Sequence, residues 1–332
     1  MNYIGSKQKL SSFLRNTIIN TVDSDVSNLV FCDLFAGTGI VGRTFKPLVK
    51  QVISNDVEHY SYILNRNYIG NHKLLNCEKR FEILNNLKEV EGFIFHNYSE
   101  NGKEGRLYFS EKNGKKIDSI RQQIETWKVE GEVTEDEFYF LLASLIESAD
   151  KIANTASVYG AYLKQIKKSA QKTLFLAPAE FSKTENFHHV YNEDSNKLIK
   201  KIKGDILYLD PPYNARQYGS NYHLLNTIAK YDTFIPKGKT GLRDYYRSSY
   251  CKKNEVKKSF EELIKNANFK YIFLSYNNEG LMTDNEVNTI MSAFGKYSLE
   301  TTNYQRFKAD KTESRNHKAT STVEYLHILE KQ

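Results

Sequence analysis

The residues with the clearest chemical meaning form the tetrapeptide Asp210-Pro211-Pro212-Tyr213. It follows residues 206–209, an apolar run typical of a buried strand. Two prolines cannot continue a central strand, and their fixed φ angles make a stiff turn whose carbonyls point in set directions. A simple exit from strand to loop would fit as well. However, the chain has only 5 prolines in 332 residues, so a chance pair between Asp and Tyr is improbable.

A carboxylate beside a backbone carbonyl suits one difficult reaction, attack by the exocyclic amine of adenine. That amine is a poor nucleophile because its lone pair is delocalised into the ring. Two acceptors that bind its hydrogens favour a more tetrahedral nitrogen and stabilise the charge that builds on it. Asp210 would supply the carboxylate, Pro211 the carbonyl, and Tyr213 a ring that stacks on the base. A methyl group on a sulfonium is already activated, so we expect no metal and no covalent enzyme intermediate.

A glycine loop, D-L-F-A-G-T-G at residues 33–39, is the second chemical feature. Gly37 and Gly39 permit a tight turn and close approach of the backbone to a ligand. A second apolar run, 52–54, leads to Asp56, which could accept hydrogen bonds from ribose hydroxyls. A plain β–α turn, with Asp56 as a helix cap, remains an alternative. Since no third glycine follows at dinucleotide spacing, the loop favours a nucleoside without phosphates and disfavours a dehydrogenase.

These side chains need a sheet to bring them together. Residues 29–35, 52–54, 206–209 and 271–274 are continuous apolar runs, which predict a mostly parallel sheet covered on both faces. Helical patterns at 9–22, 222–231 and 256–267 complete a doubly wound α/β fold. Three of the strands lead into Asp33, Asp56 and Asp210, and ligands bind at the carboxyl ends of such strands.

The stretch from 60 to 189 breaks this alternation. It is mostly helical in pattern, as at 135–153 and 160–170, with polar, turn-rich joints around 101–105 and 111–115. We therefore expect a catalytic domain made of residues 1–59 and 190–332, with an inserted domain at 60–189. Near the C-terminus, 297–303 and 322–329 predict a hairpin.

Composition limits the class of protein. The formal net charge is +7, and residues 194–332 carry 23 Lys+Arg against 16 Asp+Glu, an excess of 23 − 16 = 7 that suits a polyanion partner. Cys32, Cys77 and Cys251 lack C-x-x-C spacing, which argues against zinc and disulfides. With no apolar run of about 18 residues and no signal peptide, we expect a soluble cytoplasmic protein, away from membranes.

Taken together, these motifs resemble the D12 class of adenine-N6 DNA methyltransferases, which includes the Dam-type enzymes. The resemblance implies a class I, Rossmann-like methyltransferase fold, S-adenosylmethionine as cofactor, and target recognition by the insert. It also implies that residues 2–7 (N-Y-I-G-S-K) pack on the cofactor, that Asp194 bonds its adenine amine, and that 273–277 line the target-base pocket. Tyr3 stands where some relatives have Trp. The implied cofactor-binding residues are Tyr3, Lys7, Asp33, Phe35, Gly37, Gly39, Asp56, Asp194 and Asp210.

Chemistry on a base inside a duplex requires extrusion of that base, so the protein must hold the DNA backbone. A basic run with interleaved tyrosines suits this role, although a solvated linker would look similar. Its members are Lys237, Lys239, Arg243, Arg247, Lys252, Lys253, Lys257 and Lys258 with Tyr245, Tyr246 and Tyr250. Other backbone or flipped-base candidates are Arg216, Gln217, Tyr218, Arg306, Lys308, Lys311, Arg315 and Lys318. Candidates for base reading in the insert are Arg121, Gln122, Gln123, Tyr159, Tyr162 and Lys164.

The leading hypothesis is a monomeric, site-specific methyltransferase of double-stranded DNA from a restriction–modification system. A cognate endonuclease would act on the same site without being bound to the enzyme. Methylation of adenine in RNA and of a glutamine amide in a protein are alternatives, since the amine poses the same problem. A non-catalytic DNA-binding protein on a methyltransferase fold is the third.

Overall fold

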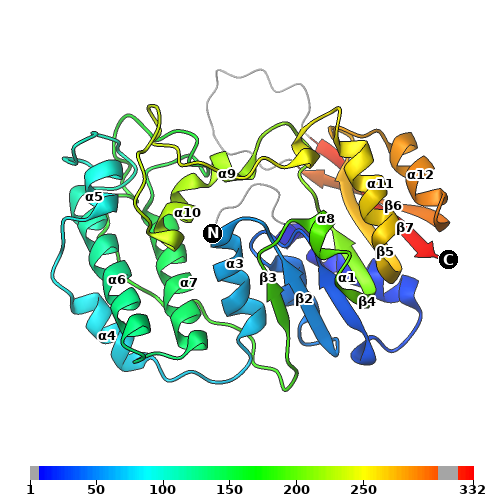
Figure 1. Cartoon of the computed structure of the whole chain (residues 1–332), viewed down its shortest axis with the longest axis horizontal. Coiled ribbons are helices and arrows are strands. Elements are labelled where there is room, and N and C mark those ends of the chain that lie inside the picture. Colours follow the sequence, from blue (N-terminus) through cyan, green and yellow to red (C-terminus); the bar gives the residue numbers. More distant parts are fainter. Residues whose placement is uncertain (1–6, 306–320) are drawn as a thin grey trace. The chain divides into compact units, whose positions relative to one another are not determined.

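The computed structural model describes residues 7–305 and 321–332. The chain divides into two compact units, and Figure 1 shows the elements of both. The sheet unit contains all the strands of the described chain and is built from Gly5–Val57, Thr184–Gln217 and Tyr246–Gln332. The helical unit is built from Glu58–Lys183 and Tyr218–Tyr245.

The sheet unit has seven strands in the order β3-β2-β1-β4-β5-β7-β6. Their bounds are β1 Val30–Asp33, β2 Gln51–Asn55, β3 His189–Tyr191, β4 Lys203–Leu209, β5 Asn268–Asn277, β6 Gly295–Gln305 and β7 Ser321–Lys331. All neighbouring pairs are parallel except those of β7, which is antiparallel to β5 and β6. The predicted doubly wound, mostly parallel sheet and the C-terminal hairpin are both confirmed.

Helices cover both faces of this sheet. They are the 3-10 turns η1 Lys7–Leu10, η2 Val26–Asn28 and η4 Ser249–Cys251, with α1 Ser11–Val22, α2 Ile40–Phe45, α8 Ser195–Leu198, α11 Val256–Asn266 and α12 Asp284–Ser292. Successive strand residues point to opposite faces. Cys32 of β1 therefore enters the core shared with Phe260 of α11, whereas Phe31 stacks on Phe45 of α2 with ring centroids 4.2 Å apart.

The helical unit has an apolar core of its own. Its elements are α3 His59–Asn65, the π-helical turn η3 Arg66–Gly70, α4 Glu78–Asn86, α5 Phe93–Tyr98, α6 Glu111–Val129, α7 Glu135–Ile152, α9 Tyr218–Asn221 and α10 His223–Lys230. Helices α9 and α10 follow the tetrapeptide in sequence, yet Leu225 of α10 is buried in the same core as Phe140 of α7. The unit thus takes in chain on both sides of the tetrapeptide.

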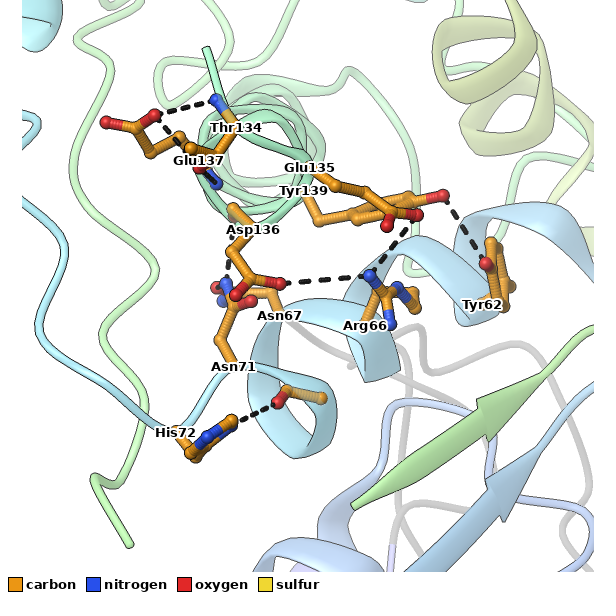
Figure 2. Close-up of polar contacts among 11 residues, drawn as sticks. Tyr62, Arg66, Asn67, Asn71, His72, Thr134, Glu135, Asp136, Glu137 and Tyr139 are labelled. Carbon is orange, nitrogen blue, oxygen red and sulfur yellow. Dashed lines mark hydrogen bonds and ion pairs between the residues drawn. The ribbon is translucent and has the colours of Figure 1, made fainter. Parts of the chain in front are cut away.

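Polar contacts join α3 and the π-helical turn η3 that follows it to α7 (Figure 2). Arg66 lies over the ring of Tyr139, 4.6 Å from its centroid, and reaches Glu135 at 3.3 Å. The Tyr62 and Tyr139 hydroxyls are 3.3 Å apart. Asn71 donates to the Asp136 carbonyl at 3.0 Å. Arg66 is the first residue of η3. These contacts therefore hold the chain at the point where the hydrogen bonding changes from α-helical to π-helical.

The helix predicted at residues 160–170 is wrong, because this segment has no helix in the structure. The side chain of Asn154 provides hydrogen bonds that a helix would otherwise supply. Its Nδ2 donates to the Leu163 carbonyl at 3.0 Å, and its Oδ1 accepts from the Lys167 amide at 3.0 Å. Hydrogen bonds from the buried side chain of Asn154, a few residues before this segment, therefore favour an irregular backbone over the predicted helix.

The turn-rich joint predicted at 111–115 is also wrong, since these residues form the start of α6. Ser110 caps the helix by accepting from the Asn113 amide at 3.4 Å. Gly114 is required by packing, because a Cβ there would lie 1.9 Å from Ser99 Oγ. The glycine that suggested a turn instead permits a close helix contact.

Candidate active site

Three carboxylates gather at the carboxyl ends of β2, β1 and β4. Asp33 ends β1, and its Cα is in register with Ser54 of β2 and Tyr208 of β4. Asp56 and Asp210 come directly after β2 and β4, so all three acids lie along one edge. This arrangement matches the expected position of a ligand site in an open α/β sheet.

Asp33 is fully buried, and only one of its two carboxylate oxygens has a hydrogen-bond partner among the described residues. Its Oδ2 accepts a hydrogen bond from the Gly42 amide at 3.0 Å, while the buried Oδ1 has no hydrogen-bond partner among the described residues. Burial raises the pKa of Asp33 to about 8, the Gly42 amide opposes the rise, and the charges of Asp210 and Asp56 add to it. A cationic ligand group would complete this site by neutralising the carboxylate.

The glycine loop is tied to the second acid. Gly37 and Gly39 have φ angles of 53° and 77°, in the left-handed region that glycine adopts without strain. The Gly37 amide donates to Asp56 Oδ2 at 2.8 Å. Phe35 is half-buried and meets the ring of Tyr250 edge-on, with centroids 5.1 Å apart. The loop is therefore held in one shape by Asp56 at one point and by packing at another.

Asp210 has a buried cation beside it. Lys7 Nζ lies 3.1 Å from Asp210 Oδ1 and 5.5 Å from the centre of the Tyr213 ring, and Lys7 is only 4% exposed. Burial raises the pKa of Asp210 to about 6, and the Lys7 ammonium limits that rise. For Lys7, burial alone would lower the pKa, but Asp210, Tyr213 and other negative neighbours hold it well above its usual value. The carboxylate is thus ionised at neutral pH.

The turn after β4 is anchored to the segment that follows β5. The Tyr213 carbonyl accepts from the Leu281 amide at 3.1 Å. The Tyr213 ring meets the Tyr276 ring edge-on at 6.0 Å, and Tyr276 is fully buried in β5. Pro211 is buried as well. These contacts fix the direction of the Pro211–Tyr213 backbone.

Residues 3–290 match the profile of the D12 class N6 adenine-specific DNA methyltransferases. The chain belongs to this family. It is 62% identical to the type II methyltransferase M.NlaIII of Neisseria lactamica over the whole of this chain and 99% of that relative. It is 41% identical to M.FokI of Planomicrobium okeanokoites, of which it covers 53%, and 39% identical to M.CviAII of Paramecium bursaria Chlorella virus 1 over 93% of each chain.

Asp194 of this adenine methyltransferase already has partners inside the sheet unit. It caps α8 by accepting from the Lys197 amide at 3.0 Å, and its other oxygen accepts from the Tyr246 hydroxyl. A cofactor amine would have to share or replace these bonds, so the role of Asp194 stays a prediction. Tyr3, Arg306, Lys308, Lys311, Arg315 and Lys318 lie outside the described residues.

Several predicted DNA contacts have structural partners instead. Arg243 is buried and forms a two-bond ion pair with Asp232, at 2.8 and 2.9 Å. Arg121 is buried and donates to the carbonyls of the α10 end, including Ala229 at 3.2 Å. Tyr159 is fully buried and donates to Asp150 at 2.9 Å. These three side chains stabilise the helical unit, so we leave them out of the proposed DNA surface.

Other predicted contacts lie where DNA could reach them. The exposed side chains are Gln122, Lys164, Arg216, Lys237, Lys239, Arg247, Lys253, Lys257 and Lys258, and the half-buried ones are Gln123, Tyr162, Gln217, Tyr218, Tyr245 and Lys252. Some have acidic neighbours, such as Lys237 with Asp244 at 2.8 Å. The Lys237–Leu242 turn is held firmly, since Arg106 donates to the Lys239 carbonyl at 3.2 Å.

Sequence reasoning missed Glu324, which reaches the same site from β7. Its Oε2 lies 3.9 Å from Lys7 Nζ, and the residue is 6% exposed. A signal existed, because Glu324 is an acid inside the apolar strand T-V-E-Y-L-H-I-L. Within the described residues, no cluster of His, Cys, Asp or Glu could hold a metal ion, and no helix is long and apolar enough to span a membrane.

Proposed function

We propose that this N6-adenine DNA methyltransferase takes its methyl group from S-adenosylmethionine and transfers it to an adenine flipped out of double-stranded DNA. We further propose that it is the modification enzyme of a restriction–modification system, because its relatives include proteins named type II methyltransferase and modification methylase. A cognate endonuclease would then cut the same site without binding the enzyme.

The observation that best supports S-adenosylmethionine as cofactor is the buried carboxylate of Asp33. Its buried Oδ1 lacks a partner among the described residues, and it lies beside a glycine loop with left-handed turns. The cationic amino group of the cofactor would supply the missing partner, and Asp56 would accept the ribose hydroxyls. When bound, the cofactor supplies a methyl group already activated for transfer.

The residues of this chain contribute by orienting the target amine and the flipped base. Asp210 and the Pro211 carbonyl would accept the two amine hydrogens and stabilise the charge that builds on the nitrogen. Tyr213, held edge-on to Tyr276, would stack on the flipped base. The paired carboxylate and carbonyl at the end of β4 carry the proposal, because they meet the requirement of an amine nucleophile without a metal.

DNA would be held by the exposed cations around Lys253 and by the firmly mounted Lys237–Leu242 turn. The helical unit would read the target sequence, since it supplies exposed amide and basic side chains such as Gln122 and Lys164. The helical unit has an apolar core of its own, so its surface side chains can be exchanged without disturbing the core of the sheet unit.

The test compares the wild type with Asp210→Ala and with the isosteric Asp210→Asn, using labelled S-adenosylmethionine and unmethylated genomic DNA. Both variants should lose transfer to DNA by at least about a hundredfold, while calorimetry still detects cofactor binding. Near-normal turnover in either variant would refute the role of Asp210. Loss of cofactor binding in both would show that Asp210 acts on the cofactor rather than on the amine.

A further inference from the structure

The active site holds one more buried charge than its ion pair requires. Lys7 and Asp210 neutralise each other at 3.1 Å, yet Glu324 also faces the ammonium, at 3.9 Å. All three side chains have little exposure, at 4%, 17% and 8%. An unneutralised buried charge costs several kcal/mol. A glutamine at position 324 would avoid that cost, so the presence of a carboxylate points to a functional role.

The sheet fixes where Glu324 can reach. It lies on β7 in register with Asn277 of β5 on one side and Thr302 of β6 on the other. Lys7 approaches from η1, and Asp210 follows β4. The three charged groups therefore come from three different elements, and the rigid sheet sets the position of Glu324 relative to the ammonium.

The geometry divides the Lys7 charge between two acceptors. An ammonium group has three donors, so it can face both carboxylates at once. Its contact with Asp210 is made to Oδ1, at 3.1 Å. Lys7 thus keeps the carboxylate ionised without occupying both of its oxygens. Glu324 attracts the ammonium toward β7, because its Oε2 lies 3.9 Å from Lys7 Nζ.

We propose that Glu324 is a positioning residue that holds the Lys7 ammonium between two carboxylates, so that Asp210 keeps one oxygen and enough negative charge to bind the target amine. This inference rests on the proposed role of Asp210. Three further groups face the pair, Asp33 from β1, Tyr208 from β4 and Tyr213 from the following turn. They stay the same in every variant described below.

The diagnostic change is Glu324→Gln, which keeps the shape and removes the charge. Glu324 contributes to the raised pKa of Asp210, so its loss should move that pKa down as Lys7 settles on Asp210 alone. We expect the acid limb of kcat to shift to lower pH by about one unit, and the plateau kcat to fall about tenfold. The KM for DNA should stay the same. Glu324→Asp keeps the charge but places it farther from Lys7. Its kcat and acid limb should lie between those of the wild type and Glu324→Gln, and it replaces the Gln variant if that variant folds poorly.

The control is Glu330→Gln, on the same strand but 44% exposed and 3.7 Å from Lys270. It should leave the kcat profile unchanged. A direct titration of the Asp210 carboxyl by ¹³C NMR, assigned with Asp210→Asn, gives a second readout that needs no activity. An unchanged Asp210 titration in Glu324→Gln would overturn the inference. If the wild type methylates no DNA, the proposed function fails, while the titration still decides whether Glu324 controls Asp210.

Discussion

Replacing Lys7 with methionine should shift the pH profile in the direction opposite to Glu324→Gln. Methionine fills a similar volume but removes the cation 3.1 Å from Asp210. Losing one partner of a buried ion pair costs about 3–5 kcal/mol. At 1.36 kcal/mol per pKa unit this corresponds to a rise of roughly 2–4 units. The Asp210 pKa would then move from about 6 to about 8 or higher.

A carboxylate with that pKa is mostly protonated at neutral pH and cannot accept the amine hydrogen. Its ionised fraction at pH 7 falls from about nine-tenths to below about one-tenth. We therefore expect kcat at pH 7, measured at saturating cofactor and DNA, to drop at least about tenfold and to recover in part as the pH rises toward 9. The exposed neighbour Lys9 provides the control, because Lys9→Met should leave the profile unchanged. A Lys7→Met enzyme with its acid limb still near pH 6 would show that the ammonium does not control Asp210.

Two further predictions concern the loop and the DNA surface. Gly39→Ala should lower the free energy of unfolding by roughly 1–2 kcal/mol and weaken cofactor binding, because φ at Gly39 is 77°. Gly160→Ala should change neither quantity, because a Cβ at position 160 would lie in open space. Thermal melts and calorimetry check this, and equal effects at both sites would contradict it. Lys253→Ala should reduce the slope of log K against log salt by up to about 0.9. Arg243→Met should instead lower the melting temperature and leave the slope unchanged, since Arg243 is paired with Asp232; the reverse pattern would place Arg243 on the DNA.

The sheet and its ligand edge could be predicted because their signals are local. Buried parallel strands are continuous apolar runs. An acid at the end of such a run, Asp33, or directly after it, Asp210, indicates the edge of the sheet where ligands bind. The loop could be predicted because Gly37 and Gly39 adopt left-handed backbone conformations that few other residues adopt.

What the sequence could not give depends on contacts between distant segments. The pairing of Lys7 with Glu324 joins residues at opposite ends of the chain, and no local pattern signals it. The segment 160–170 is a different case, because the nearby side chain of Asn154 bonds its backbone, and a helical pattern in the sequence does not reveal such a bond. Arg243 looked like a phosphate ligand because its type and neighbours are basic, but Asp232 satisfies it.

The most direct test of the account is to incubate the purified protein with S-adenosylmethionine and unmethylated genomic DNA, and then to map modified bases by single-molecule sequencing. We predict N6-methyladenine confined to one short sequence motif, with no modified base in a parallel reaction of Asp210→Asn. Label found in RNA or protein but not in DNA would contradict the account, and so would modified adenines produced equally by the Asp210→Asn variant.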